Sequence, residues 1–95
     1  MAEPRRLLAL FYDYVPDMLD RRGPFREGHL ALIDRFASDG RIVIAGAVGD
    51  PPSGGLIVFA ADERDAIDAF VAEDPYVANG LVTAHRVEPW TVVTS

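Results

Sequence analysis

The segment from residue 22 to residue 38 reads RGPFREGHLALIDRFAS, and the rest of the chain is arranged around it. Its apolar residues recur every three or four positions, the spacing of a helix with one face turned to a core. The stripe consists of Phe25, Leu32, Ile33 and Phe36. His29 lies four residues after the first of these and four before Ile33, so an ionisable ring shares the stripe. We therefore predict a helix over Arg22 to Ser38 with a histidine on its buried face.

Four apolar segments are predicted to be β-strands, and a second helix precedes the last of them. The strands are Arg6–Tyr14, Arg41–Val48, Leu56–Ala61 and Leu81–Val93. Asp62 is a suitable N-cap for the second helix, and Pro75 disfavours helical geometry at Asp74, so that helix should end there. Pro89 predicts an edge position or a bulge for the last strand.

The order of elements is therefore β-α-β-β-α-β, in one domain spanning residues 1–95. This order predicts a ferredoxin-like α+β fold, a four-stranded antiparallel sheet with two helices on one face. Residues 16–23 are expected to be a plain connector. The loop at residues 49–55 is expected to join the second and third strands as a hairpin, since it lacks the Lys and the following helix of a phosphate-binding loop. Asn79-Gly80 predicts a turn.

The composition excludes several functional classes. The 95 residues include 9 basic and 15 acidic side chains, giving a net charge of −6, which argues against nucleic acid and anionic membranes as partners. The absence of cysteine rules out disulfides and thiolate chemistry. Two histidines far apart in the sequence make a poor ligand set, so we expect no metal and no cofactor. The apolar run Leu7 to Tyr12 is too short to span a bilayer, and we expect a cytoplasmic protein.

The predicted sheet has more apolar surface than two helices can cover. The first three strands are apolar on both faces, and a soluble monomer rarely leaves several hundred Å² of such surface open. We therefore expect a homodimer in which a second copy covers the open face of the sheet. The other interpretation is that the dimer is only structural, with side chains filling all the space between the sheets.

His29 has two possible roles. It is either a neutral core histidine bonded to a backbone carbonyl, or a general acid or base, since an imidazole suits proton transfer near neutral pH. A catalytic histidine usually needs an acceptor that orients its second nitrogen. Asp74, at the end of the neighbouring helix, is the best candidate for that acceptor, although aspartate before proline is also common in turns.

Four short motifs together resemble the YCII-related family, small proteins of the dimeric α+β barrel group. They are Arg26-Glu27-Gly28-His29-Leu30, Asp39-Gly40-Arg41, Ala45-Gly46 and Ala72-Glu73-Asp74-Pro75-Tyr76. The resemblance extends from the first helix to the last strand, and the acidic-Asp-Pro-Tyr segment is its most specific part. The family pattern usually has proline after the arginine of Arg-x-x-His, and Glu27 stands there in this chain.

This resemblance implies a His–Asp pair in a cleft, with the two roles falling on His29 and Asp74. It also implies cofactor-independent proton-transfer chemistry of the lyase or isomerase kind on a small cyclic or aromatic substrate, since relatives include a dehydrochlorinase for chlorinated hydroxyquinols and, more distantly, muconolactone isomerase. Arg26 would then hold an anionic oxygen or form a surface salt bridge. Tyr76 would donate a hydrogen bond or pack at the helix end, and Tyr12, with Tyr14, would line the cleft or pack.

Two other functions are compatible with the same sequence. The cleft can bind a small molecule without changing it, as a regulatory module, because catalysis and binding both use a polar pair in an apolar pocket. Alternatively, the sheet face binds another protein and the domain is structural. His85, between charged neighbours on the last strand, is expected to be a half-exposed strand residue with no part in the site.

Overall fold

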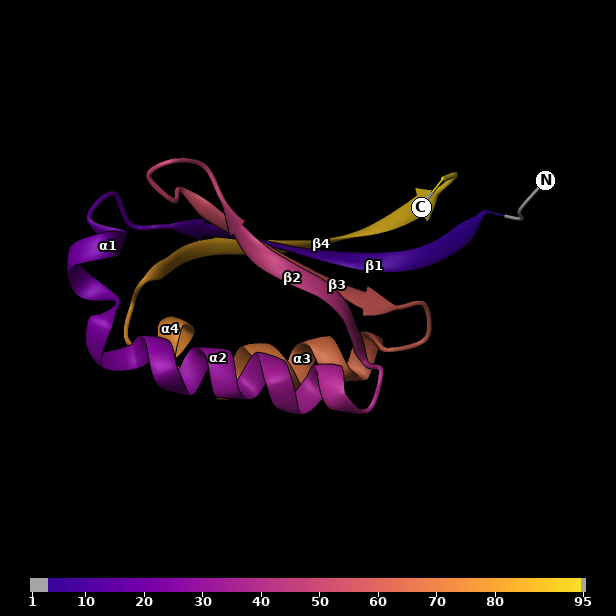
Figure 1. Cartoon of the computed structure of the whole chain (residues 1–95), viewed down its shortest axis with the longest axis horizontal. Coiled ribbons are helices and arrows are strands. Elements are labelled where there is room, and N and C mark those ends of the chain that lie inside the picture. The colour runs from indigo at the N-terminus through magenta and orange to yellow at the C-terminus, as the bar shows by residue number, and fades with distance from the viewer. Residues whose placement is uncertain (1–3, 95) are drawn as a thin grey trace.

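A computed structural model describes residues 4–94 as four strands and four helices (Figure 1). In chain order they are β1 (Arg5–Tyr14), α1 (Met18–Arg21), α2 (Gly23–Ser38), β2 (Ile42–Val48), β3 (Gly54–Ala60), α3 (Arg64–Glu73), α4 (Pro75–Ala78) and β4 (Val82–Val92). The strands form one antiparallel sheet in the order β2-β3-β1-β4. The predicted ferredoxin-like arrangement is confirmed, and Pro89 lies on an edge strand as expected.

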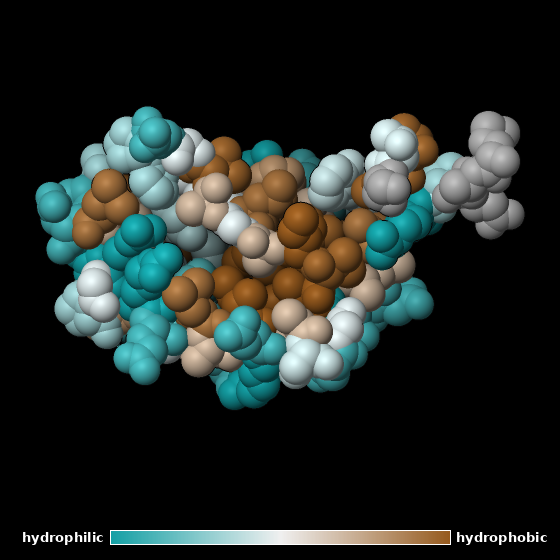
Figure 2. Space-filling view, viewed as in Figure 1, coloured by the Kyte–Doolittle hydropathy of each residue, from teal (hydrophilic) through white to brown (hydrophobic). Residues whose placement is uncertain are grey.

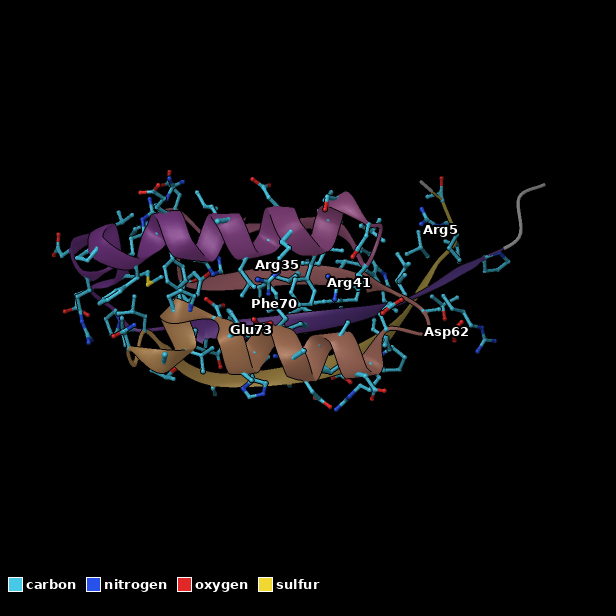
Figure 3. All side chains as sticks on the ribbon, turned by 90° about the horizontal axis from the view of Figure 1, so that it is seen from below. Arg5, Arg35, Arg41, Asp62, Phe70 and Glu73 are labelled. Carbon is cyan, nitrogen blue, oxygen red and sulfur yellow. The ribbon has the colours of Figure 1, made fainter. Side chains whose placement is uncertain are left out.

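The two long helices lie side by side on one face of the sheet (Figures 1 and 3). Pro24 stands in the first turn of α2, where its missing N–H removes no hydrogen bond. Gly40, just beyond the helix, has a φ of 86°, the left-handed conformation in which glycine has no Cβ to clash. These end signals, together with the apolar stripe, explain why the long helix was predicted nearly to its observed ends.

The main core lies between the sheet and these helices. The buried face of α2 presents Leu32 and Phe36, and that of α3 presents Ile67 and Phe70. In Figure 3 Phe70 lies between the two helices, and its ring meets those of Phe36 and Phe59 edge-on at 5.5 and 5.8 Å. Edge-to-face aromatic pairs of this kind add about 0.5–1.5 kcal/mol to the burial of each ring.

The connector predicted at residues 16–23 is wrong, because it contains the short helix α1. Four residues are too few for an apolar period to appear in the sequence. The helix is held by Met18, which is buried in a second small cluster with Val15, Tyr76 and Leu81. A tertiary contact, rather than local pattern, therefore determines this element.

Two predicted boundaries also need correction. Asp62 is not a cap: α3 begins at Arg64, with Glu63 at the N-cap position and no side-chain cap bond. The second long helix does end at Asp74 as predicted, and a further helical turn, α4, follows it before the expected turn at Gly80. Strand β3 begins at Gly54 rather than at residue 56. Glycine is needed at this position because the strand lies so close to β1 that a Cβ would collide with the carbonyl oxygen of Tyr12.

The face of the sheet away from the helices carries exposed apolar side chains. Ile44, Val48 and Trp90 are 64%, 52% and 44% exposed. Hydrophobic side chains gather over the middle of the molecule, where β2 crosses the view, while the helices below are largely hydrophilic (Figure 2). Within residues 4–94, no helix is long and apolar enough to cross a membrane.

Candidate functional site

Asp74 occupies the single residue between α3 and α4. Its backbone is extended, with a ψ of 119°, because Pro75 follows and disfavours a helical conformation at this position. The side chain then folds over the start of α4, where Oδ1 accepts a hydrogen bond from the backbone N–H of Tyr76 at 3.0 Å. The residue is 0% exposed, so a carboxylate is held inside the protein by local chain geometry.

His29 reaches this carboxylate from the middle of α2. Its Nδ1 lies 2.8 Å from Oδ1 of Asp74, and the residue is only 5% exposed. The preceding residue, Gly28, is where α2 passes Pro75. A Cβ at position 28 would lie 3.2 Å from the Cγ of that proline, closer than most such contacts. Glycine therefore permits the helix-to-helix approach that brings the histidine to the aspartate.

Tyr12 supplies the other side of the carboxylate. Its hydroxyl donates to Oδ2 of Asp74 at 2.8 Å from strand β1, and the tyrosine is 2% exposed. Burial, reinforced by the neighbouring carboxylate, raises the pKa of Tyr12 above its ordinary value. The phenol thus stays protonated and remains a donor. With Tyr12, Tyr76 and His29 around it, the carboxylate has the hydrogen bonds that a buried charge requires.

This arrangement fixes the tautomer of His29. A carboxylate only accepts hydrogen bonds, so Nδ1 carries the proton and the lone pair of the neutral ring is on Nε2. The ring stacks on Tyr76, with 3.8 Å between ring centroids and 8° between planes. Nε2 makes no hydrogen bond to the described residues. Every fully buried side-chain nitrogen among those residues has a partner, so Nε2 is not fully buried.

A pocket of about 340 Å³ lies against His29 and Tyr76, between α2 and strand β2. Its volume is at the small end of the range for small-molecule sites. Apolar and small residues form much of the wall, and charged or phenolic groups form the rest. The other lining residues are Tyr14, Arg22, Arg26, Leu30, Ile33, Asp34, Ala45, Gly46, Ala47 and Ile57.

The phenols of this pocket are protonated at neutral pH. Burial raises the pKa of Tyr14 to about 12, with a further contribution from Tyr76. Burial also raises the pKa of Tyr76, although Arg22 and Arg26 act in the opposite direction. The pocket thus offers the imidazole ring of His29 beside neutral hydroxyl groups and two guanidinium groups. Within the described part of the chain, no three His, Asp or Glu side chains are arranged to hold a metal ion.

Comparison with known proteins identifies the family of this chain. The model of the YCII-related domain matches residues 7–91. The chain belongs to the YCII-related family. Among curated relatives, an uncharacterized protein of Haemophilus influenzae is 29% identical over 88% of this chain and 95% of its own length. Protein YciI of Escherichia coli is 29% identical over 81% of this chain and 88% of its own length.

A solved structure of a related enzyme has the same fold. It is 5-chloro-2-hydroxyhydroquinone dehydrochlorinase from Burkholderia phenoliruptrix, in complex with 2,5-dihydroxybenzoquinone. The two chains are 25% identical, with a TM-score of 0.72, over 88% of this chain and 92% of that one. The fold of this YCII-related chain is therefore the one used by dimeric α+β barrel proteins, and a member of that group is an enzyme.

The structure brings together most of the site residues predicted from the sequence. His29 and Asp74 are in contact, as expected. The ring of Tyr76 packs against that of His29, and the donation by its hydroxyl stays a prediction. Tyr12 lies behind the carboxylate rather than in the pocket, whereas Arg26 lines the pocket and forms no ion pair with the described residues.

Some residues of the site were not predicted from the sequence. His85, which was expected to lie outside the site, does so: it is exposed on β4 and does not line the pocket. Arg22 lines the pocket, but its position depends on helix α1, which the sequence pattern did not reveal. Gly28 was quoted only as part of a motif. A glycine in the middle of a strong helical pattern was the available signal, since it costs about 1 kcal/mol there and usually has a packing reason.

Proposed function

We propose that this YCII-related protein is a small enzyme that moves a proton on a cyclic or aromatic substrate without a cofactor. His29 is the general base and acid, acting through Nε2. Asp74 is a positioning residue that holds the ring and stabilises the imidazolium formed when His29 accepts a proton. The proposal rests chiefly on one observation: a fully buried carboxylate lies 2.8 Å from Nδ1, so the basic nitrogen is left to the pocket.

The related dehydrochlorinase supports this choice of chemistry. Loss of hydrogen chloride from a chlorinated hydroxyquinol releases one proton and one chloride ion, and the product is a hydroxyquinone, so atoms and electrons balance without an oxidant. A base next to a partly apolar pocket suits such a reaction. The complex of that relative contains a planar dihydroxyquinone, which is the class of ring we propose for this chain.

The remaining site residues have distinct proposed roles. Tyr76 forms one wall of the pocket, and its ring, stacked on His29, favours the imidazolium by a cation–π contribution. Tyr12 holds the carboxylate in place by donating to its second oxygen. Arg26 lines the pocket, where its guanidinium can donate hydrogen bonds to an anionic oxygen of the substrate.

We also propose that a second copy of the chain covers the open face of the sheet. The exposed Ile44, Val48 and Trp90 support this, since a face-to-face dimer would remove them from water. The fold shared with the dimeric α+β barrel group is a second support. Sedimentation of the native protein should give twice the mass of the chain, and Ile44→Asp should shift it to the mass of one chain. A native monomer at micromolar concentration would contradict the proposal.

The function is tested by incubating the protein with 5-chloro-2-hydroxyhydroquinone and measuring chloride release. We expect turnover by the native protein and by Arg35→Gln, a surface control, but not by His29→Gln. Thermal unfolding of both variants establishes that they are folded. Turnover that survives in folded His29→Gln would contradict the catalytic role. Saturable binding with the compound recovered unchanged would identify a binding module instead.

A further inference from the structure

The pocket beside His29 contains two cations on one side. Arg22 and Arg26 are four residues apart, and Arg22 has helical backbone angles of −73° and −20°, so the two lie about one helical turn apart. The corner between α1 and α2 fixes the first of them. Its N–H donates to the carbonyl of Met18 at 2.9 Å, and its carbonyl accepts from Phe25 at 2.9 Å.

Neither of these guanidinium groups is neutralised by a carboxylate within residues 4–94. Other arginines in that range do have such partners, among them Arg21 with Asp17 and Arg35 with Glu73. Arg22 and Arg26 form no ion pair there and both face the pocket. A guanidinium is a planar fork of donors that matches the two oxygens of a carboxylate and can also donate to the single oxygen of a phenolate, so this side of the pocket is suited to an oxyanion.

The opposite side of the pocket has a different character. Asp34 lines it two to three helical turns further along α2, and a carboxylate there disfavours a second anionic group on the ligand. Between the two sides lie small and apolar residues, including Ile33, Ala47 and Ile57. The pocket therefore has a positively charged end and a negatively charged end along α2.

We propose that the substrate carries an oxyanion, a ring carboxylate or phenolate, and that Arg22 and Arg26 hold it at the N-terminal side of the pocket. The inference rests on the proposed function, since it takes this pocket as the substrate site. It adds a second binding residue, Arg22, and it restricts the substrate class to anions. With the oxyanion held there, the ring of the ligand lies along His29, and its far edge points toward Asp34.

The test uses benzoate and its neutral counterpart benzamide, with 4-nitrophenolate as the phenolate probe. Binding is followed by NMR through the backbone amides of residues 45–47. We expect benzoate or 4-nitrophenolate to bind at least about tenfold more tightly than benzamide, and whichever anion binds better identifies the oxyanion. Arg22→Gln and Arg26→Gln should each weaken anion binding about five- to tenfold. Arg21→Gln, beside the pair but outside the pocket, should bind as the native protein does.

Several outcomes would overturn the inference: equal binding of benzamide and the anions, unchanged affinity in both arginine variants, or no binding of either anion. His29→Gln separates this inference from the proposed function, because it should still bind the anion while losing turnover. If the protein prefers anions but releases no chloride, the proposed reaction is rejected and the anion site stands. If it releases chloride but does not prefer anions, the role of the arginine pair is rejected and the reaction stands.

Discussion

Two acid–base pairs join α2 to the segment around the end of α3, and they differ in almost everything except their location. His29 and Asp74 meet at 2.8 Å in the interior, where the side chains are 6% and 0% exposed. Arg35 and Glu73 meet at 2.9 Å through both carboxylate oxygens, with side chains 56% and 50% exposed (Figure 3). The acidic residues are neighbours in the chain, yet one points inward and the other outward.

The difference shows what burial adds to a charge pair. Water already solvates Arg35 and Glu73, so their pairing contributes about 0–1 kcal/mol. Asp74 has no water to replace its partners, and losing one of them leaves an uncompensated buried charge. The inner pair is therefore the one that the surrounding residues must support, as the hydroxyl of Tyr12 and the N–H of Tyr76 do. A pair that the fold must support in this way is also pre-organised for chemistry.

The largest difference between the pairs should appear in activity. General acid–base catalysis contributes about 10²–10⁴-fold to a rate, so His29→Gln should lower kcat by that factor. Arg35→Gln should leave kcat within about twofold, because Arg35 does not line the pocket and its side chain pairs with the exposed Glu73. Chloride release from the chlorinated hydroxyquinol is the measurement. Equal rates in the two variants would remove the functional distinction between the pairs.

Stability should separate the two acidic residues next. Asp74→Ala should lower the free energy of unfolding by about 3–5 kcal/mol, because it removes the common acceptor of three buried donors. Glu73→Ala should lower it by about 1 kcal/mol or less. Urea unfolding of both variants gives the comparison. If Asp74→Ala is too unstable to purify, Asp74→Asn, which keeps the shape, should lie between them; two equal losses would contradict the assignment.

Tyr12→Phe should sharpen the comparison by removing one support of the inner pair. Oδ2 of Asp74 would lose its donor in a buried site, at a cost of about 1–3 kcal/mol in the free energy of unfolding. Because the carboxylate is then less well held, kcat should fall more than KM changes. A variant as stable as the native protein would show that the hydroxyl is not needed to hold the carboxylate.

High pH should destabilise the inner region through its phenols. The pKa of Tyr14 is raised from 10.0 to about 12, so the folded state favours the neutral phenol. Its contribution to stability is complete below pH 10 and is lost as the pH rises toward 12, when the unfolded chain ionises first. Unfolding measured across this range should become easier with rising pH, and less steeply so in Tyr14→Phe. An identical slope in the variant would contradict the assignment.

The smallest effect should be the salt dependence of the outer pair. Added salt screens exposed charges, so the difference of about 1 kcal/mol or less between native protein and Arg35→Gln should shrink at 1 M salt. The cost of Asp74→Ala should change little, since buried groups are screened much less. Urea unfolding at low and high concentrations of sodium chloride measures both differences. A salt-sensitive inner pair would mean that water reaches it.

Sequence pattern predicted the elements of this fold because their signals are local. The apolar stripe predicted α2, the proline after Asp74 predicted the end of α3, and the apolar segments predicted the strands. The order of these elements then predicted the topology. Helix α1 and the start of β3 were missed because they depend on contacts across the fold, those of buried Met18 and of Gly54 against β1. These two segments are short or glycine-rich, so no apolar period appears in their sequences.

The candidate site was predictable to the same extent. His29 stood out as an ionisable residue on an apolar stripe, and the family resemblance paired it with Asp74. The register of β1 against β3 and β4 places Tyr12 behind the carboxylate, and no local signal reports a strand register. Arg22 depends on the corner between α1 and α2 in the same way. Supporting residues are set by tertiary geometry, whereas the central pair is set by sequence pattern.

The most direct measurement is the tautomer of His29, read from the side-chain ¹⁵N shifts of labelled protein with the exposed His85 as internal reference. In the neutral ring we expect a protonated Nδ1, held by Asp74, and an unprotonated Nε2 facing the pocket. That result would mean that the base is in place before any substrate arrives. A neutral His29 with its proton on Nε2 would contradict the account, because Nδ1 would then not donate to the carboxylate and the pocket would face a donor instead of a base.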